Sequence, residues 1–121
     1  MIRSDWTAAG VAVACLLVCA PVEAHSAKQI AGVAAYYSKG YHGLTASGER
    51  YDPSKFTAAH RTLPFGTRVL VTDARTHRSV MVTVNDRGPF NKGRVIDLSM
   101  AAAKALHMTD RGLIRVTAVV Q

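Results

Sequence analysis

The chain has 121 residues, with 15 lysines and arginines against 8 aspartates and glutamates, and a formal net charge of +7. This length accommodates one domain with a modest core and excludes a second of ordinary size. A strongly basic chain attracts polyanions such as nucleic acid, an anionic membrane face or an acidic cell-wall polymer. The same lysines and arginines could equally serve only to solvate the surface.

Residues 1–24 have the features of an export signal. After a basic start, the run from Ala8 to Ala20 is apolar and uncharged, and a plausible cleavage site follows at Ala24. The run is too short for a comfortable membrane span of roughly 20 residues. Two alternatives are an uncleaved N-terminal anchor and lipidation at Cys19, although Val18 is bulky where a lipidation motif normally has a small residue.

Export changes what the composition implies. The segment contains both cysteines, and its charged residues, Arg3, Asp5 and Glu23, give it a net charge of −1. Its removal leaves 97 residues, which contain no cysteine and have a net charge of +8. They have no disulfide and no thiol nucleophile, and depend on their core for stability. We predict no nucleic-acid partner for an exported chain, and membrane contact only if Cys19 is lipidated. Residues 25–30 are expected to form a short extension, and 31–121 the one domain.

Short strands dominate this domain. The predicted strands, from β-branched content and alternation, are Gly32 to Tyr37, Thr67 to Thr72, Ser79 to Val84, Val95 to Ile96 and Leu113 to Val120. The second and third should form a hairpin. Residues 40–51, rich in Gly, Thr and Ser, indicate a long loop.

One segment is convincingly helical. Met100 to Met108 is rich in Ala, Leu, Lys and Met, Ser99 is a natural N-cap, and Gly112 follows soon after its end. A small sheet of many short strands protects its edges best by closing. We therefore predict a mainly β barrel with one short helix between the last two strands.

Two carboxylates stand at strand ends beside a turn. Asp86 lies in the run Val84 to Phe90, and Asp97 lies in the following run, Arg94 to Ser99. Loop carboxylates held by a rigid sheet are good candidates for function. The alternatives are structural: Asp86 could accept backbone N–H bonds that fix the turn, and Asp97 could brace the start of the helix.

Four motifs in order carry a family resemblance: Thr45 to Asp52, Thr57 to Thr67, Val84 to Phe90, and Val95 to Ser99. Together they resemble the rare lipoprotein A family of bacterial cell-envelope proteins, which is similar to expansins, barwin and family 45 endoglucanases. The resemblance covers residues 31–121 and implies a six-stranded double-psi β-barrel with one or two short helices. For active members it implies lytic transglycosylase activity on peptidoglycan, preferring glycan strands stripped of stem peptides.

The resemblance also implies roles for individual residues. It places the family's functional acidic residue on Asp86, its histidine on His60 and its glutamate on Glu49, which we take as the predicted catalytic set. Asp97 falls where expansins keep a second functional aspartate. As alternatives, His60 could be a satisfied structural histidine and Glu49 a solvated charge.

A lytic transglycosylase needs fewer groups than an ordinary glycosidase, which uses two carboxyls. The C6 hydroxyl of muramic acid attacks the anomeric carbon and leaves a 1,6-anhydro end, so one carboxyl, here Asp86, could act as acid and then as base. An acid near neutral pH needs its charged form disfavoured, by burial or by a neighbour such as Asp97 or Glu49. An inward guanidinium of Arg87 would oppose this, whereas His60 could position the substrate.

Four residues are the predicted substrate contacts: Asp97, Tyr37, Arg87 and Phe90. The aromatic rings of Tyr37 and Phe90 could stack on sugars, although aromatic residues in so small a chain are often core. The histidines show no spacing with cysteines or carboxylates that suggests a metal, so we predict no metal and no cofactor.

The sequence thus predicts an exported, monomeric enzyme that acts on peptidoglycan glycan strands in the periplasm or cell envelope, with secretion as the alternative location. Many family members continue into a peptidoglycan-binding repeat, whereas this sequence stops at Gln121, so septal recruitment is not expected. Two alternatives remain open. One is an expansin-like protein that binds polysaccharide without cutting it, and the other is a secreted barrel that binds a partner.

Overall fold

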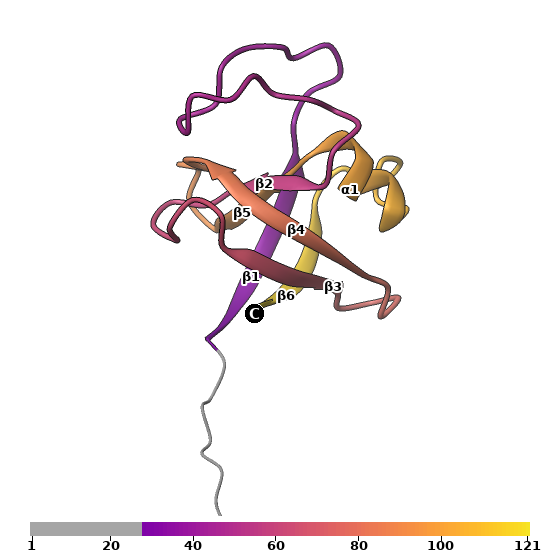
Figure 1. Ribbon diagram of the computed structural model, residues 1–121. Coiled ribbons are helices and arrows are strands. Elements are labelled where there is room, and N and C mark those ends of the chain that lie inside the picture. Colours follow the sequence, from indigo (N-terminus) through magenta and orange to yellow (C-terminus); the bar gives the residue numbers. More distant parts are fainter. Residues whose placement is uncertain (1–27) are drawn as a thin grey trace, which may run out of the picture.

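The computed structural model describes residues 28–121, which form six strands and one helix. The elements are β1 (Gln29–Tyr36), β2 (Thr57–Ala59), β3 (Arg68–Asp73), β4 (Ser79–Asp86), β5 (Arg94–Leu98), α1 (Met100–Ala105) and β6 (Ile114–Val120). The strands close into a barrel in the order β1-β5-β2-β4-β3-β6 (Figure 1). This confirms the predicted mainly β, six-stranded barrel with one short helix. The predicted export signal and Cys19 lie outside the described residues.

Two pairings in the barrel are parallel, β1 with β5 and β2 with β4, and the other four are antiparallel. Parallel neighbours cannot be joined by a tight turn, so the chain needs long crossings. The crossing between β1 and β2, residues 37–56, arches over one end of the barrel (Figure 1). Ser47 N donates to Asn85 O there (3.2 Å), so this crossing lies against the end of β4.

Alternating side chains fill the barrel, as predicted for β3 and β6. Val69 and Val71 of β3 are buried, whereas Arg68, the first residue of this strand, is exposed. On β6 and the strands facing it, the buried interior includes Val80, Val82, Val84, Ile96, Leu98, Ile114, Val116 and Ala118. β3 and β4 form the predicted hairpin, in register from Arg68↔Thr83 to Thr72↔Ser79. The barrel is therefore a packed core with no room for a ligand, and binding must use its rim.

The strands extend further than the sequence predicts. β1 begins at Gln29, two residues before the predicted domain boundary, because Gln29 pairs with Val119 of β6. β4 continues to Asp86, because Ala59 of β2 pairs with it. β2 itself was not predicted, since three residues containing two alanines carry little β signal. It is nonetheless central, lying between β4 and β5.

The helix is shorter than predicted and ends at Ala105 rather than Met108. Its predicted N-cap is confirmed, because the Ser99 side chain accepts a hydrogen bond from Ala102 N (3.3 Å). The chain turns away after Leu106, with His107 in the left-handed region (φ 54°). Met108 is still buried, so it contributes to the core from a turn.

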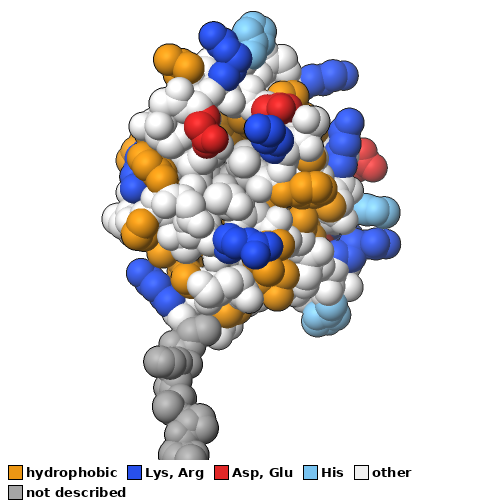
Figure 2. All heavy atoms as spheres, viewed as in Figure 1, with side chains coloured by type: hydrophobic (Ala, Val, Ile, Leu, Met, Phe, Trp, Pro, Cys, Tyr) orange, Lys and Arg blue, Asp and Glu red, His pale blue; other side chains and the backbone are white. Residues whose placement is uncertain are grey.

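Lysine and arginine side chains stand at several separate places around the face shown in Figure 2. The positive charge on that face is therefore spread out and not confined to one patch. Within residues 28–121, no helix is long and apolar enough to cross a membrane.

Candidate functional site

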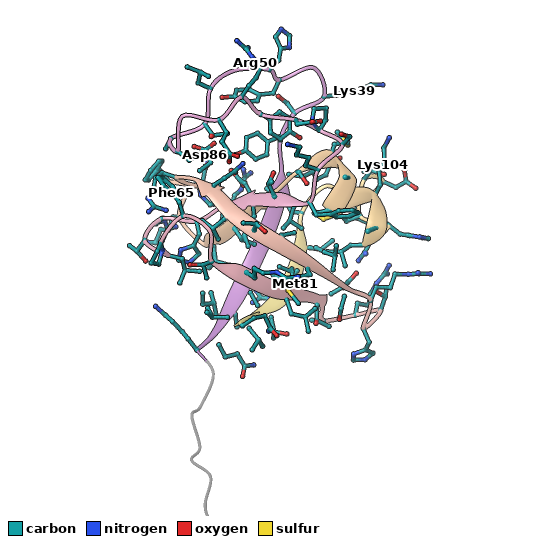
Figure 3. The ribbon with its side chains drawn as sticks, viewed as in Figure 1. Lys39, Arg50, Phe65, Met81, Asp86 and Lys104 are labelled. Atoms are coloured by element: carbon teal, nitrogen blue, oxygen red, sulfur yellow. The ribbon has the colours of Figure 1, made fainter. Side chains whose placement is uncertain are left out.

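Asp86 lies at the end of β4, beneath the 37–56 crossing (Figure 3). Its Oδ2 accepts a hydrogen bond from the Tyr37 hydroxyl (2.5 Å). Its Oδ1 accepts hydrogen bonds from Ala46 N (2.7 Å) and Arg87 N (2.8 Å). All three partners are donors, an arrangement that suits a carboxylate. The predicted turn-fixing role of Asp86 is thus confirmed for Oδ1, while Oδ2 keeps lone pairs beyond the one used by Tyr37.

Tyr37 belongs to a cluster of three tyrosine rings. It stacks on Tyr51, with centroids 4.3 Å apart and planes 16° apart, and Tyr41 lies against both. The Tyr51 hydroxyl accepts a hydrogen bond from Met100 N (3.0 Å), which anchors the stack to the start of α1. Burial, followed by the hydrogen bond to Asp86, raises the pKa of Tyr37 far above its ordinary value. Tyr37 therefore stays protonated and remains a donor to Asp86.

Asp97 lies on β5, between Ala35 of β1 and Ala59 of β2. Ala59 also pairs with Asp86 on its other side, so the two aspartates flank one alanine, with Cα atoms about 10 Å apart by normal strand spacing. Burial raises the pKa of Asp97, the charge of Asp86 adds to this, and Arg94 opposes it. A proton donor in a glycosidase-type reaction needs such a shift.

The alternative role for Asp97, bracing the helix, is not supported. Its Oδ1 is buried and finds no hydrogen-bond partner among residues 28–121. The helix start is capped by Ser99 instead. A buried carboxyl oxygen without a partner is costly in a folded protein, and such groups call for an explanation beyond packing.

His60 follows β2 and connects to Asp86 through the backbone, because His60 N donates to Asp86 O (3.1 Å). Its ring Nδ1 accepts hydrogen bonds from Thr62 N and Leu63 N, both at 3.1 Å. In the neutral ring the proton is then on Nε2. Burial, together with nearby positive side chains, lowers the pKa of His60, so the ring is neutral near pH 7. These bonds agree with the structural alternative for His60, and its Nε2–H has no hydrogen-bond partner within residues 28–121.

Glu49 is exposed on the 37–56 crossing, but it is not simply solvated. Its Oε1 accepts hydrogen bonds from Asn85 Nδ2 (3.2 Å) and Ser47 Oγ (3.3 Å). Asn85 precedes Asp86 and is buried. Glu49 therefore links the crossing to the end of the strand that carries Asp86. Of the predicted catalytic residues, Glu49 thus contacts Asn85 and His60 contacts Asp86.

Arg87 turns away from the carboxylate of Asp86. Its Nη1 donates to His60 O (3.1 Å) and Leu63 O (2.8 Å), and its guanidinium lies 4.1 Å from the centre of the Phe65 ring. Arg87 thus holds the 60–65 loop in place. This geometry favours a structural role for Arg87 over the substrate contact predicted from sequence, because its guanidinium bonds the 60–65 loop and not the Asp86 carboxylate.

Phe90 follows the turn and is 77% exposed, which makes it available to a sugar ring. Figure 3 shows Phe65, from the neighbouring loop, near the labelled Asp86. Within the described part of the chain, no group of three or more potential metal ligands occurs.

Sequence reasoning missed several residues that build the site. Arg61 donates through Nε to Pro89 O (2.7 Å) and through Nη2 to Arg94 O (2.7 Å), which fixes the 88–94 loop. Asn85 links β4 to Glu49. Both lie inside the quoted motifs, but their partners are 28 to 36 residues away, and no local pattern reveals such pairs.

Comparison with known proteins decides the family. A family model described as lytic transglycolase matches residues 29–118. The chain belongs to this lytic transglycolase family. The resemblance to rare lipoprotein A read from the four motifs is thereby confirmed.

Relatives of this lytic transglycolase chain include the endolytic peptidoglycan transglycosylase RlpA of Pasteurella multocida, which is 51% identical over 83 residues. That match covers 68% of this chain and 28% of the relative. The chain spans about a quarter of the length of the curated relatives it matches.

Two solved structures have the same fold. The Streptomyces papain inhibitor is 28% identical, with a TM-score of 0.62, and the match covers 77% of this chain and 94% of that one. A mutant expansin of Clavibacter michiganensis, in complex with cellohexaose, is 23% identical, also with a TM-score of 0.62, covering 78% of this chain and 50% of that one. They support the double-psi barrel architecture.

Proposed function

We propose that this protein is an exported endolytic lytic transglycosylase of the cell envelope, which cleaves peptidoglycan glycan strands with Asp86 as the essential carboxyl. The observation that carries the proposal is the cradle of three donors around Asp86, with Asp97 on the other side of Ala59. Two carboxyls in contrasting environments are what acid–base chemistry on a sugar requires. The names of the barrel-sharing relatives support the same activity.

The proposed reaction breaks the β-1,4 bond between C1 of MurNAc and O4 of GlcNAc. The C6 hydroxyl of the same MurNAc attacks C1, which forms the 1,6-anhydro bond, and its proton passes to a base. The departing O4 takes a proton from an acid and becomes a hydroxyl. One proton is taken up and one released, so atoms and charge balance without water as a reactant.

The environments of the two carboxyls support a division of this work, in place of one carboxyl acting twice. Asp86, surrounded by donors, is suited to accept the proton of the C6 hydroxyl. Asp97, whose pKa is raised by burial, is suited to donate a proton to the leaving oxygen. Proton exchange with solvent then restores both groups.

The remaining residues support this chemistry. The free Nε2–H of His60 can donate to a sugar hydroxyl, since Nδ1 is occupied by the loop. Glu49 keeps the 37–56 crossing against β4, and the exposed ring of Phe90 offers a sugar-stacking surface. Tyr37, predicted from sequence as a sugar-stacking ring, holds Asp86 in position through its hydroxyl.

The test is to incubate the protein with intact and amidase-stripped peptidoglycan and to analyse soluble products by mass spectrometry. We expect anhydromuramic ends, absent with Asp86→Asn and retained with Asp110→Asn, an exposed aspartate in the turn after α1. Reducing ends would instead mean hydrolysis by a water-activating pair. Anhydromuramic ends released at the normal rate by Asp86→Asn would overturn the assignment of the carboxyl.

The second candidate function is binding without cleavage. The observation that favours it is the papain inhibitor, whose whole chain is almost covered by this same barrel, so the fold also serves a protein named for binding another protein. In this case the protein would sediment with peptidoglycan but release no products. Retained sedimentation with no soluble muropeptides, in wild type and Asp86→Asn alike, would favour this function.

A further inference from the structure

A cavity of about 660 Å³ lies between the end of β1, the start of β5 and α1. Its apolar surface comes from Tyr36, Met100 and Leu113, and Leu113 is 49% exposed. The Tyr36 hydroxyl donates to Thr109 O (2.9 Å), which holds this ring in place as part of the wall. The proposed reaction uses none of these side chains.

The cavity is connected to the site through β1 and its partner strand β5. Ala35 lines the cavity and pairs with Asp97 across the β1–β5 ladder. Arg94 of β5 also lines the cavity, and its charge acts on Asp97 of the same strand. A glycan chain held at the two aspartates could therefore continue toward this cavity along the same rim of the barrel.

The charge of the cavity is entirely positive. Lys39, Arg94 and Lys104 line it, and no aspartate or glutamate does. The one ion pair in residues 28–121 joins Arg111 to Asp73, so none of these three cations is paired there. Figure 3 shows Lys39 and Lys104 on the α1 side of the molecule, away from Asp86. Three unpaired cations around an apolar wall select an anion attached to a partly apolar body.

We propose that this cavity binds a carboxylate of the peptidoglycan strand held at Asp86, so that charge selects the strand that is cut. The inference rests on the proposed function. GlcNAc is neutral, and MurNAc carries a lactyl carboxylate that is free only when no peptide is attached. The other source of carboxylates is the stem peptide itself. In both cases lysine and arginine contact the carboxylate, while the apolar wall contacts the lactyl methyl group or an alanine side chain.

The test measures binding at equilibrium by NMR titration, with all variants made in the Asp86→Asn protein so that the probes are not cut. The probes are a peptide-free GlcNAc–MurNAc tetrasaccharide, the same sugar with its lactyl carboxylates converted to methylamides, the same sugar with stem tetrapeptides, and neutral chitotetraose. The test variant is Lys39→Gln/Lys104→Gln. The matched control is Arg75→Gln/Arg78→Gln, which removes two charges from the exposed β3–β4 turn.

We expect the peptide-free sugar to bind more tightly than chitotetraose, and the lysine double variant to weaken it about tenfold, at up to about 1 kcal/mol per ion pair. The control variant should bind as the Asp86→Asn parent does. Salt should weaken the interaction, since the Debye length is about 8 Å at physiological ionic strength. Weak binding of the methylamide would assign the lactyl carboxylate, whereas tighter binding of the peptide-bearing sugar would assign the stem peptide.

Equal binding of all four probes, or equal binding by the lysine and control variants, would overturn the proposal. The proposed function fails separately, in the cleavage assay. A protein that binds the carboxylate but releases no products would refute the enzyme and keep the cavity. A protein that cuts neutral and charged strands equally would refute the cavity and keep the enzyme.

Discussion

Two substitutions of His60 separate its structural role from its chemical one. His60→Ala leaves the N–H groups of Thr62 and Leu63 without their acceptor. Each such hydrogen bond contributes about 1 kcal/mol, so we expect a loss of about 2 kcal/mol. At about 4 to 8 °C per kcal/mol for a domain of this size, Tm should fall by about 10 °C. His60→Asn places Oδ1 where Nδ1 lies and should retain most of this stability.

Thermal unfolding followed by circular dichroism measures the first effect, and release of muropeptides measures the second. Both variants lack the Nε2–H donor, so both should lose activity if that atom contacts substrate. If His60→Ala unfolds within about 2 °C of wild type, or if His60→Asn falls as far as His60→Ala, then the two hydrogen bonds are not what stabilises the loop. A fully active His60→Asn would limit the residue to its structural role.

Three further predictions concern ionisable groups. Burial alone would raise the pKa of Asp73, but the hydrogen bond from Arg111 and others outweigh it and lower the pKa to about 2. Ionised Asp73 therefore stabilises the folded state by about 2 kcal/mol above about pH 4, and this stabilisation is lost as the pH falls toward 2. Arg111→Met should flatten this part of an acid-unfolding curve. Because the pKa of Tyr37 is raised, its stabilisation is present below about pH 10 and lost above it, so Tyr37→Phe should be less sensitive to alkaline unfolding. Because the pKa of Asp97 is raised, its charged form opposes folding near neutral pH; Asp97→Asn should be at least as stable as wild type in urea, while product release falls about a hundredfold or more. An Asp97→Asn variant that is less stable, or fully active, would contradict the proton-donor role.

The regular parts of the fold could be predicted from the sequence because their pattern is local. The β3–β4 hairpin follows from alternation on both strands, and the helix start follows from Ser99. β2 could not be predicted, since its three residues become a strand only through β4 and β5 on either side. The extension of β4 to Asp86 has the same cause, and it turns an expected loop residue into the last residue of a strand.

The site residues could be named from motifs, but the contacts between them could not be predicted. Glu49 and Asn85 are 36 residues apart, and Tyr37 and Asp86 are 49 apart, so each contact exists only because the 37–56 crossing folds back over the barrel end. The direction of the Arg87 side chain was likewise open in the sequence. It is settled by two backbone carbonyls of the 60–63 turn, which no side-chain pattern indicates.

The opposite environments of the two aspartates follow from their places on the barrel. Asp86 ends a strand at the rim, where the peptide groups of a turn and of the crossing are free to donate to it. Asp97 lies within β5, where the neighbouring backbone groups are already used in ladders to β1 and β2, so burial acts on it without compensating donors. Two carboxyl groups with different hydrogen-bonding environments can thus arise on adjacent ladders from backbone placement alone. For Asp86 and Asp97 to exchange roles, a hydrogen-bond donor would have to be placed beside Asp97. A variant with such a donor should lose activity even though Asp86 is unchanged.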